Sequence, residues 1–187
     1  VPGGAALRFE KLLSSEGDWA VLSIGLSDFR PLVEIYEVVW QDQVLEHVAE
    51  LLLSGRETCG TPTDLVARLT GETFLVITRA SNATSWEVEL RRAFRARVVA
   101  TLPSDHLRDG MICSSPAHRL PMPSLAIGIV TDQDGPFAGP RDILEKVTKA
   151  RNQNERPALL FNLNSLTVTA NRLREEIQVA EYAPTLL

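Results

Sequence analysis

The spacing of hydrophobic residues changes several times along this chain of 187 residues. Residues 19–26 form a short apolar run between polar flanks, which predicts a buried strand. Over residues 32–53 apolar side chains recur at intervals of three and four, which predicts a helix or a pair of helices. Pro31 fits the first turn of that helix, and Asp28 is expected to cap its free amides. Residues 55–63, rich in Gly, Pro and Thr, predict a loop.

Two strand-like runs meet within residues 64–78, on either side of the polar sequence Thr70-Gly71-Glu72-Thr73. A polar turn that contains glycine, placed between such runs, is typical of a β-hairpin. The hairpin would present the carboxylate of Glu72 at its tip.

Helical spacing returns over residues 85–102, and Pro103 is expected to end that helix. Residues 103–123 are rich in proline, which disfavours regular structure. We expect them to form an insertion with one short strand around residues 111–113.

The remaining pattern adds strands and helices in alternation. Residues 124–130 and 158–163 are apolar strand-like runs, a helix is expected to open near Pro140, and residues 173–182 predict a charged amphipathic helix. The order of strand, helices, two strands, helix, strand, helix and strand favours a two-layer α+β domain with a central sheet.

Composition and charge exclude some classes of function. The net charge of −5 gives no general attraction for nucleic acid, and the arginine group Arg91, Arg92, Arg95 and Arg97 spreads over more than one helical face. That group is more typical of a solvated surface than of a binding patch. The apolar runs are much shorter than the roughly 20 residues of a membrane-spanning helix, and no leader segment is evident. We therefore expect a single cytoplasmic domain that binds neither nucleic acid nor membrane.

Cysteine and histidine spacing argues against a zinc site. Cys59 and Cys113 lie far apart, and His47, His106 and His118 form no pattern typical of metal ligands. Two isolated cysteines fit a reducing compartment.

The hairpin sequence resembles a known signature. Residues 68–74, Arg-Leu-Thr-Gly-Glu-Thr-Phe, resemble the Arg-Leu-Gly-Gly-Asp/Glu-Glu-Phe hairpin of the GGDEF family, the diguanylate cyclases. Residues 124–130 resemble the Ser-Ile-Gly-Ile strand of that family, and residues 1–7 look like its opening segment. The resemblance implies a ferredoxin-like nucleotide-cyclase fold, with a mostly antiparallel sheet flanked by helices.

The resemblance also implies a domain division and further protein upstream. Residues 1–165 would form a degenerate GGDEF domain, in which residues 103–123 are the insertion, and residues 166–187 would form a helical extension.

The metal-binding acids implied by the resemblance are mostly lost. Family members open an Asp-x-Asp-x-Phe-Lys segment with a metal-binding Asp, and Gly25 stands at that position here, with Ser27 at the next acidic one. In the hairpin signature Thr70, Gly71, Glu72, Thr73 and Phe74, an acid remains at Glu72, while Thr73 replaces the second acid. Asp28 cannot substitute for Gly25, because its side chain would point to the opposite face of an extended strand. Glu72 is the weak remaining metal candidate, and a solvated acid at a hairpin tip is the alternative.

Nucleotide-binding positions implied by the resemblance survive unevenly. Val33 and Asp42 match the two residues that select guanine in the family, and Asp42 is equally typical of a solvated helix position. Arg30 and Arg156 match two phosphate-binding cations, whereas Asn152 stands where an Ala-Lys segment places its Lys.

Product inhibition in the family uses an Arg-x-x-Asp pair, which is Thr61-Pro62-Thr63-Asp64 here. Asp64 is therefore a remnant of an inhibitory site whose arginine is lost, and Arg56 is a poor substitute because it precedes a loop.

These positions favour a catalytically inactive regulatory or dimerisation domain of a bacterial signalling protein. The alternatives are a weakly active diguanylate cyclase that makes cyclic di-GMP from GTP, and a receptor for GTP or cyclic di-GMP. The expected partners are signalling domains of the same chain, other proteins or a second copy. No cofactor is expected, and Mg²⁺ would bind only together with a nucleotide.

Overall fold

A four-stranded antiparallel sheet forms the centre of the computed structural model, which describes residues 17–115 and 118–155. Its strands are β1 (Ala20–Ser27), β2 (Leu65–Thr70), β3 (Thr73–Thr78) and β7 (Ser124–Thr131), in the spatial order β2-β3-β1-β7. Every residue of β1 is buried, because this strand has a neighbour on each side and helices above and below. The predicted strands at 19–26 and 124–130 and the predicted hairpin are confirmed.

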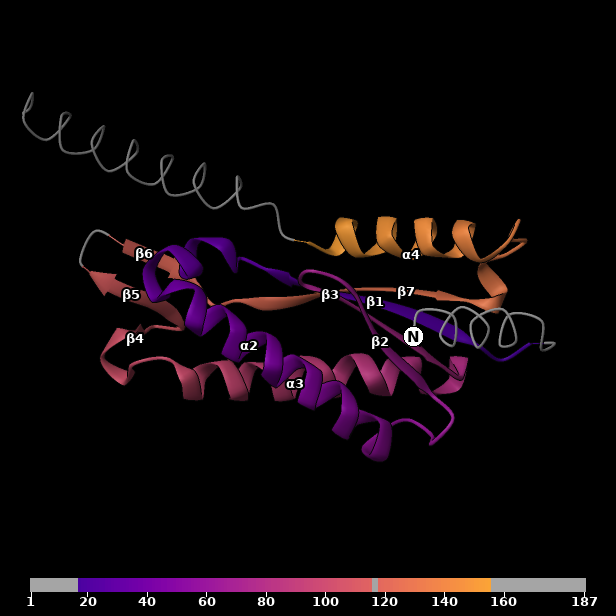
Figure 1. The fold of residues 1–187 in the computed structure, drawn as a ribbon, viewed down its shortest axis with the longest axis horizontal. Coiled ribbons are helices and arrows are strands. Elements are labelled where there is room, and N and C mark those ends of the chain that lie inside the picture. Colours follow the sequence, from indigo (N-terminus) through magenta and orange to yellow (C-terminus); the bar gives the residue numbers. More distant parts are fainter. Residues whose placement is uncertain (1–16, 116–117, 156–187) are drawn as a thin grey trace, which may run out of the picture. The chain divides into compact units, whose positions relative to one another are not determined.

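Helices cover both faces of this sheet (Figure 1). α2 (Arg30–Thr58) and α3 (Ala83–Thr101) pack on one face, and α4 (Pro140–Asn154) packs on the other. Short 3₁₀ turns lie at Ala80–Asn82, Ser104–His106 and Asp132–Asp134. This arrangement confirms the expected α+β class.

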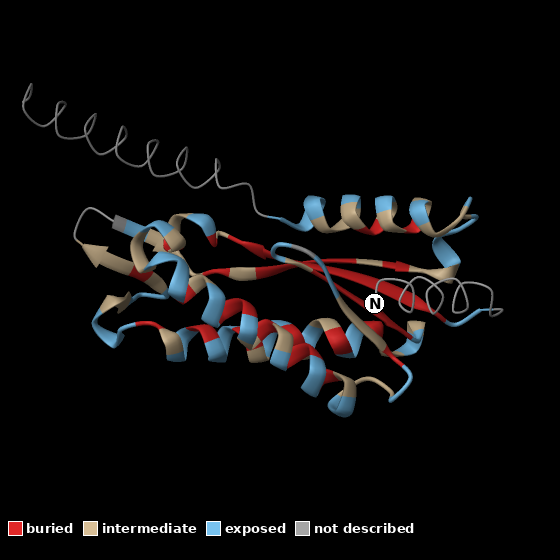
Figure 2. Cartoon of the chain, in the orientation of Figure 1, coloured by how far each residue is buried: buried red, intermediate tan, exposed pale blue. Residues whose placement is uncertain are grey.

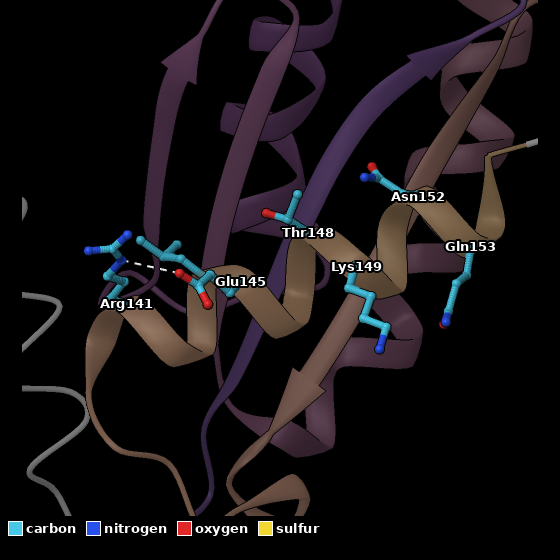
Figure 3. A pocket seen from close by; sticks show the side chains of 7 residues that line it. Arg141, Glu145, Thr148, Lys149, Asn152 and Gln153 are labelled. Carbon is cyan, nitrogen blue, oxygen red and sulfur yellow. Dashed lines mark hydrogen bonds and ion pairs between the residues drawn. The ribbon is translucent and has the colours of Figure 1, made fainter.

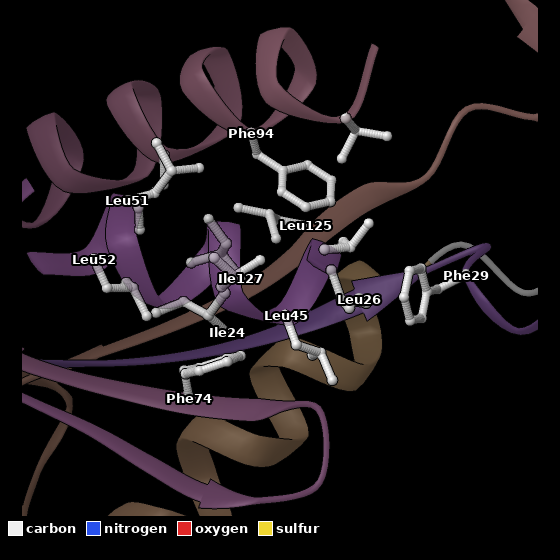
Figure 4. Packing of buried hydrophobic residues seen from close by; sticks show 14 of the residues in the cluster. Ile24, Leu26, Phe29, Leu45, Leu51, Leu52, Phe74, Phe94, Leu125 and Ile127 are labelled. Carbon is white, nitrogen blue, oxygen red and sulfur yellow. The ribbon is translucent and has the colours of Figure 1, made fainter. Parts of the chain in front are cut away.

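Successive side chains of each strand point to opposite faces of the sheet, so the buried side chains form two hydrophobic clusters. Ile24 of β1 and Phe74 of β3 belong to the larger cluster, on the face covered by α2 and α3 (Figure 4). Val21 and Leu75 belong to the smaller cluster, together with Val147 of α4. Figure 2 shows the outcome, with buried strands between helices whose outer sides are exposed. Odd-numbered residues of β1 and β3 therefore face α4.

α2 is two helical segments joined at Glu37, whose backbone has φ 69° and ψ 173°. The expected pair of helices is confirmed, but the helix continues to Thr58, so the prediction of a loop from residue 55 was wrong at its start. Phe29 is the N-cap residue, and Asp28 precedes it with a left-handed φ of 59°. The structure therefore places the N-cap one residue later than expected, at Phe29.

The proline-rich insertion forms a second, three-stranded sheet of β4 (Leu107–Arg108), β5 (Met111–Ser115) and β6 (His118–Pro121). The expectation of a single short strand was wrong, because Asp109 and Gly110 have positive φ and form a tight two-residue turn between β4 and β5. Ile112 anchors this sheet in the larger hydrophobic cluster.

The predicted strand at 158–163, the helix at 173–182 and the boundary at 165 lie outside the described residues. Within the described part, no helix is both long and apolar enough to cross a membrane.

Candidate functional site

The hairpin tip places Glu72 against α2. Thr70 pairs with Thr73, and Gly71 takes a left-handed φ of 51° between them. Glu72 is exposed, and its Oε1 accepts a hydrogen bond of 3.1 Å from Nε2 of Gln41. The carboxylate at the hairpin tip is therefore held at the surface by an amide.

Gly25 of β1 and Thr73 of β3 lie side by side on the face covered by α4. The antiparallel register pairs Ile24 with Phe74, and its continuation places Gly25 opposite Thr73. The guanidinium of Arg151, from the last turn of α4, lies over both positions: its Nη1 donates to Oγ1 of Thr73 at 3.0 Å. A Cβ on Gly25 would lie 3.3 Å from Cδ and 3.4 Å from Nη1 of Arg151. We call these three residues the Gly25–Thr73–Arg151 cluster.

Sequence reasoning missed Arg151. It aligned Asn152 with the family lysine, whereas the structure turns the preceding residue towards the sheet. Nη2 of Arg151 donates to Oδ1 of Asn152 at 3.2 Å, and Asn152 itself is exposed. Ala150-Arg151 follows the Ala-Lys pattern one residue earlier, and that dipeptide was the available signal.

The side chains of the cluster do not fit a divalent metal ion. Mg²⁺ prefers carboxylate and other oxygen ligands, whereas Gly25 supplies no side chain, Thr73 supplies a neutral hydroxyl and Arg151 supplies a positive charge. Among the described residues no group of three or more His, Cys, Asp or Glu side chains could hold a metal ion. The adjoining Ser27 is buried, and its hydroxyl has no hydrogen-bond partner among the described residues.

The remaining nucleotide-binding candidates are dispersed. Arg30 is exposed at the start of α2, and Asp42 is exposed further along the same helix. Val33 is half-buried and packs against the larger hydrophobic cluster. Arg156 lies outside the described residues.

Asp64, which was expected to be a remnant of an inhibitory site, is turned into the protein. Its side chain is buried, Oδ2 accepts a hydrogen bond of 3.1 Å from Nε1 of Trp86, and Oδ1 accepts one of 2.5 Å from Oγ1 of Thr61. Gly60 permits this arrangement, because a Cβ there would collide with both Asp64 and Trp86. Asp64 therefore serves as an internal hydrogen-bond acceptor.

Arginines of α3 are largely paired. Arg91 bonds to Glu87 at 2.9 Å, Arg92 to Glu89 at 2.6 Å and Arg97 to Glu50 at 2.8 Å. The Arg92 hydrogen bond lowers the pKa of the half-exposed Glu89 carboxyl. These pairs match the interpretation of a solvated surface.

A shallow groove follows the outer side of α4 (Figure 3). Arg141 and Glu145 bond to each other across it at 3.1 Å, and Lys149 and Gln153 line its other end. Its mixture of opposite charges favours no single class of ligand.

Comparison with known proteins shows the fold. The sequence matches no protein-family model and none of the curated proteins searched. The structure matches the FimX GGDEF domain of Pseudomonas aeruginosa with a TM-score of 0.55 and 14% identity, over 82% of this chain and 84% of that one. It also matches the GGDEF domain of DgcB from Caulobacter crescentus, solved in complex with c-di-GMP, with a TM-score of 0.55 and 18% identity over 80% and 77% of the two chains.

A third match is the diguanylate cyclase SiaD of Pseudomonas aeruginosa, solved in complex with its activator SiaC. Its TM-score is 0.55 at 15% identity, over 80% of this chain and 52% of that one. These matches of the structure show the fold: the chain contains a GGDEF-like domain, with the fold of the nucleotide cyclases.

Proposed function

We propose that this GGDEF-like domain is a catalytically inactive regulatory or dimerisation module of a cytoplasmic bacterial signalling protein. The observation that carries the proposal is the Gly25–Thr73–Arg151 cluster. In this cluster Gly25 of β1 and Thr73 of β3 are neighbours, and neither has an acidic side chain. Joining two GTP molecules requires a 3′-hydroxyl to attack an α-phosphate while negative charge develops on the phosphate oxygens. Divalent cations held by carboxylates normally stabilise that charge.

Glu72 does not replace the missing acids. It lies at the hairpin tip and bonds to Gln41 of α2, whereas the cluster lies on the face covered by α4. One exposed carboxylate rarely positions the ions that such a reaction needs. The proposal therefore includes no resident metal or other cofactor, and Mg²⁺ would arrive only with a nucleotide.

An activity assay tests the proposal. The purified domain is incubated with GTP and either Mg²⁺ or Mn²⁺, and cyclic di-GMP is measured by chromatography beside an active diguanylate cyclase as positive control. We expect no product above the level without protein. Product that grows with the concentration of this domain would establish the alternative of a weakly active cyclase.

The nucleotide-receptor alternative is tested by thermal unfolding. Millimolar GTP or cyclic di-GMP is expected to leave the melting temperature unchanged, because a ligand far below its dissociation constant adds almost no stability. A dose-dependent rise with GTP but not ATP, lost in Asp42→Ala, would establish a guanine receptor instead.

Partner proteins are the remaining part of the proposal. SiaD was solved with its activator SiaC, and another structure of DgcB contains a coiled coil beside its GGDEF domain. Domains of this fold are therefore found in contact with other protein chains or beside coiled coils, which supports a role through partners. Sedimentation of the whole chain at several concentrations tests for a second copy as the partner, and a mass that stays monomeric at all of them would remove the dimerisation role.

A further inference from the structure

The backbone of α4 lies unusually close to β7 at the Gly25–Thr73–Arg151 cluster. A Cβ on Gly128 would collide with the backbone N of Arg151 and the carbonyl O of Val147. The side chain of Asn154 donates to the carbonyl O of Ile127 at 2.9 Å, which fixes the end of the helix on the same strand. The aliphatic part of the Arg151 side chain therefore passes over β7 and reaches β1.

Gly25 then leaves the space that Arg151 fills. Cδ, Nε and Nη1 of the arginine all lie within 3.4 Å of the position that a Cβ of residue 25 would take. The guanidinium is held at two points, by Oγ1 of Thr73 at 3.0 Å and by Oδ1 of Asn152 at 3.2 Å. A half-buried guanidinium with two fixed hydrogen bonds keeps one orientation over the two strands.

The charge of this guanidinium has no acidic partner in the part of the chain that the structure describes: no carboxylate lies within ion-pair distance of Arg151. Both positions beneath it are uncharged. The cluster is therefore a fixed positive charge at the place where, by the resemblance, a metal ion and its acids would lie. A divalent cation would meet repulsion there instead of ligands.

We infer that Arg151 is an internal substitute for the metal ion, so that the Gly25–Thr73 position excludes divalent cations even when its acids are restored. Carboxylates introduced at positions 25 and 73 would form ion pairs with the guanidinium, which already touches both positions. Metal binding would require the removal of Arg151 as well. This inference deepens the proposed function and rests on it for the assignment of the position.

Mn²⁺ alone is the probe, with the free-ion signal in electron paramagnetic resonance as readout. Three proteins are compared: Gly25→Asp/Thr73→Glu, the same pair with Arg151→Gln, and the same pair with Arg141→Gln. Arg141 is the matched control, because it lies on the same helix and bonds to Glu145 away from the sheet. The triple variant that includes Arg151→Gln is expected to bind one Mn²⁺ at least about tenfold more tightly than the other two proteins.

Two results would overturn the inference. Equal Mn²⁺ affinity with and without Arg151 would show that the guanidinium does not exclude the ion. Equally weak binding in all three, with each protein folded by circular dichroism, would show that the position is no metal position. The readout is independent of GTP, so cyclic di-GMP production by the unmodified protein would refute the proposed function and leave this result intact.

A single substitution gives a second measurement if the multiple variants fail to fold. The carboxyl introduced by Gly25→Asp is followed by NMR titration. We expect its pKa below the ordinary aspartate value, because the guanidinium lies beside it, and a return towards that value when Arg151→Gln is added. A pKa that does not respond to Arg151→Gln would contradict the ion pair on which the inference depends.

Discussion

The indole N–H of Trp86 donates a hydrogen bond of 3.1 Å to Asp64, and both side chains are buried. Trp86 of α3 is fully buried, and Gly55 of α2 lies against its ring so closely that a Cβ there would collide with the indole. The resemblance of the sequence implies an inhibitory-site position for Asp64, and this contact gives the residue a structural role.

Removing this acceptor is expected to destabilise the fold. Asp64→Ala leaves the Trp86 N–H and the Thr61 hydroxyl without their partner, at a cost of about 1 to 3 kcal/mol in the free energy of unfolding. Asp64→Asn retains one acceptor and is expected to cost less. Urea unfolding measures both, with Glu72→Ala as the exposed control within about 0.5 kcal/mol of the unmodified protein. Equal stability of Asp64→Ala and the control would show that the buried bond contributes nothing.

Cyclic di-GMP binding through Asp64 is expected to be absent, since both carboxylate oxygens already accept internal hydrogen bonds. Titration calorimetry tests this directly. Micromolar binding that disappears in a folded Asp64→Asn variant would show that the carboxylate turns outward to a ligand.

Glu37 is expected to be a point of backbone strain. Its φ of 69° and ψ of 173° lie in a region that is used almost only by glycine. Glu37→Gly should therefore stabilise the protein by about 1 kcal/mol or more. Glu34→Gly is the matched control, because this exposed glutamate lies in the regular first segment of α2 and should lose about 1 kcal/mol. The same sign of change at both positions would mean that Glu37 is not strained.

The two glycines beneath α4 are expected to differ in their tolerance of a methyl group. Gly128→Ala forces a Cβ against backbone atoms of α4, which cannot rotate away, and should cost about 1 to 3 kcal/mol or more. Gly25→Ala meets the side chain of Arg151 at 3.3 Å, and that side chain can shift, so a smaller loss is expected. Chemical denaturation compares the two, and a larger loss at Gly25 would contradict the close approach of helix and strand.

Cys59 is expected to be a slow nucleophile. Burial raises the pKa of its thiol, and the negative charges of Glu89 and Asp64 add to this, although a hydrogen bond with Thr58 opposes it. Because only the thiolate reacts, alkylation of a Cys113→Ser variant should reach half of its maximal rate at a higher pH than in denaturing urea. The raised pKa also means that the thiol's contribution to stability is lost as the pH rises through the folded value. If alkylation of the folded protein reached half of its maximal rate at a lower pH than alkylation in urea, the raised pKa of Cys59 would be refuted.

Local sequence patterns were sufficient to predict most strands of the central sheet and most of its helices. The apolar runs of β1 and β7, the hairpin and the period of α3 depend on neighbouring residues, and the sequence displays those directly. The second sheet was missed because the prolines were given more weight than the Asp109-Gly110 turn signal. Pro103 and Pro121 lie at the boundaries of elements, where the missing amide costs little.

The site was harder to predict from the sequence, since it depends on contacts between segments that are far apart in the chain. Gly25 and Thr73 were predicted from the resemblance to be positions of lost acids, but the presence of Arg151 above them depends on how closely α4 approaches β7 at Gly128. Likewise, no local pattern distinguishes an outward Asp64 from one that bonds to a tryptophan 22 positions away.

The proposed exclusion of metal ions by Arg151 would also have an evolutionary consequence. A reverse mutation that restores an acid at either position 25 or position 73 would supply a partner for the arginine, and so would strengthen the arrangement that excludes the ion. Loss of the arginine alone would leave a glycine and a threonine with no charge to offer. Each single step back towards a metal site therefore gives no metal binding, and return requires at least three coordinated changes. Such dependence between positions would make the loss of a metal site here close to irreversible by stepwise selection.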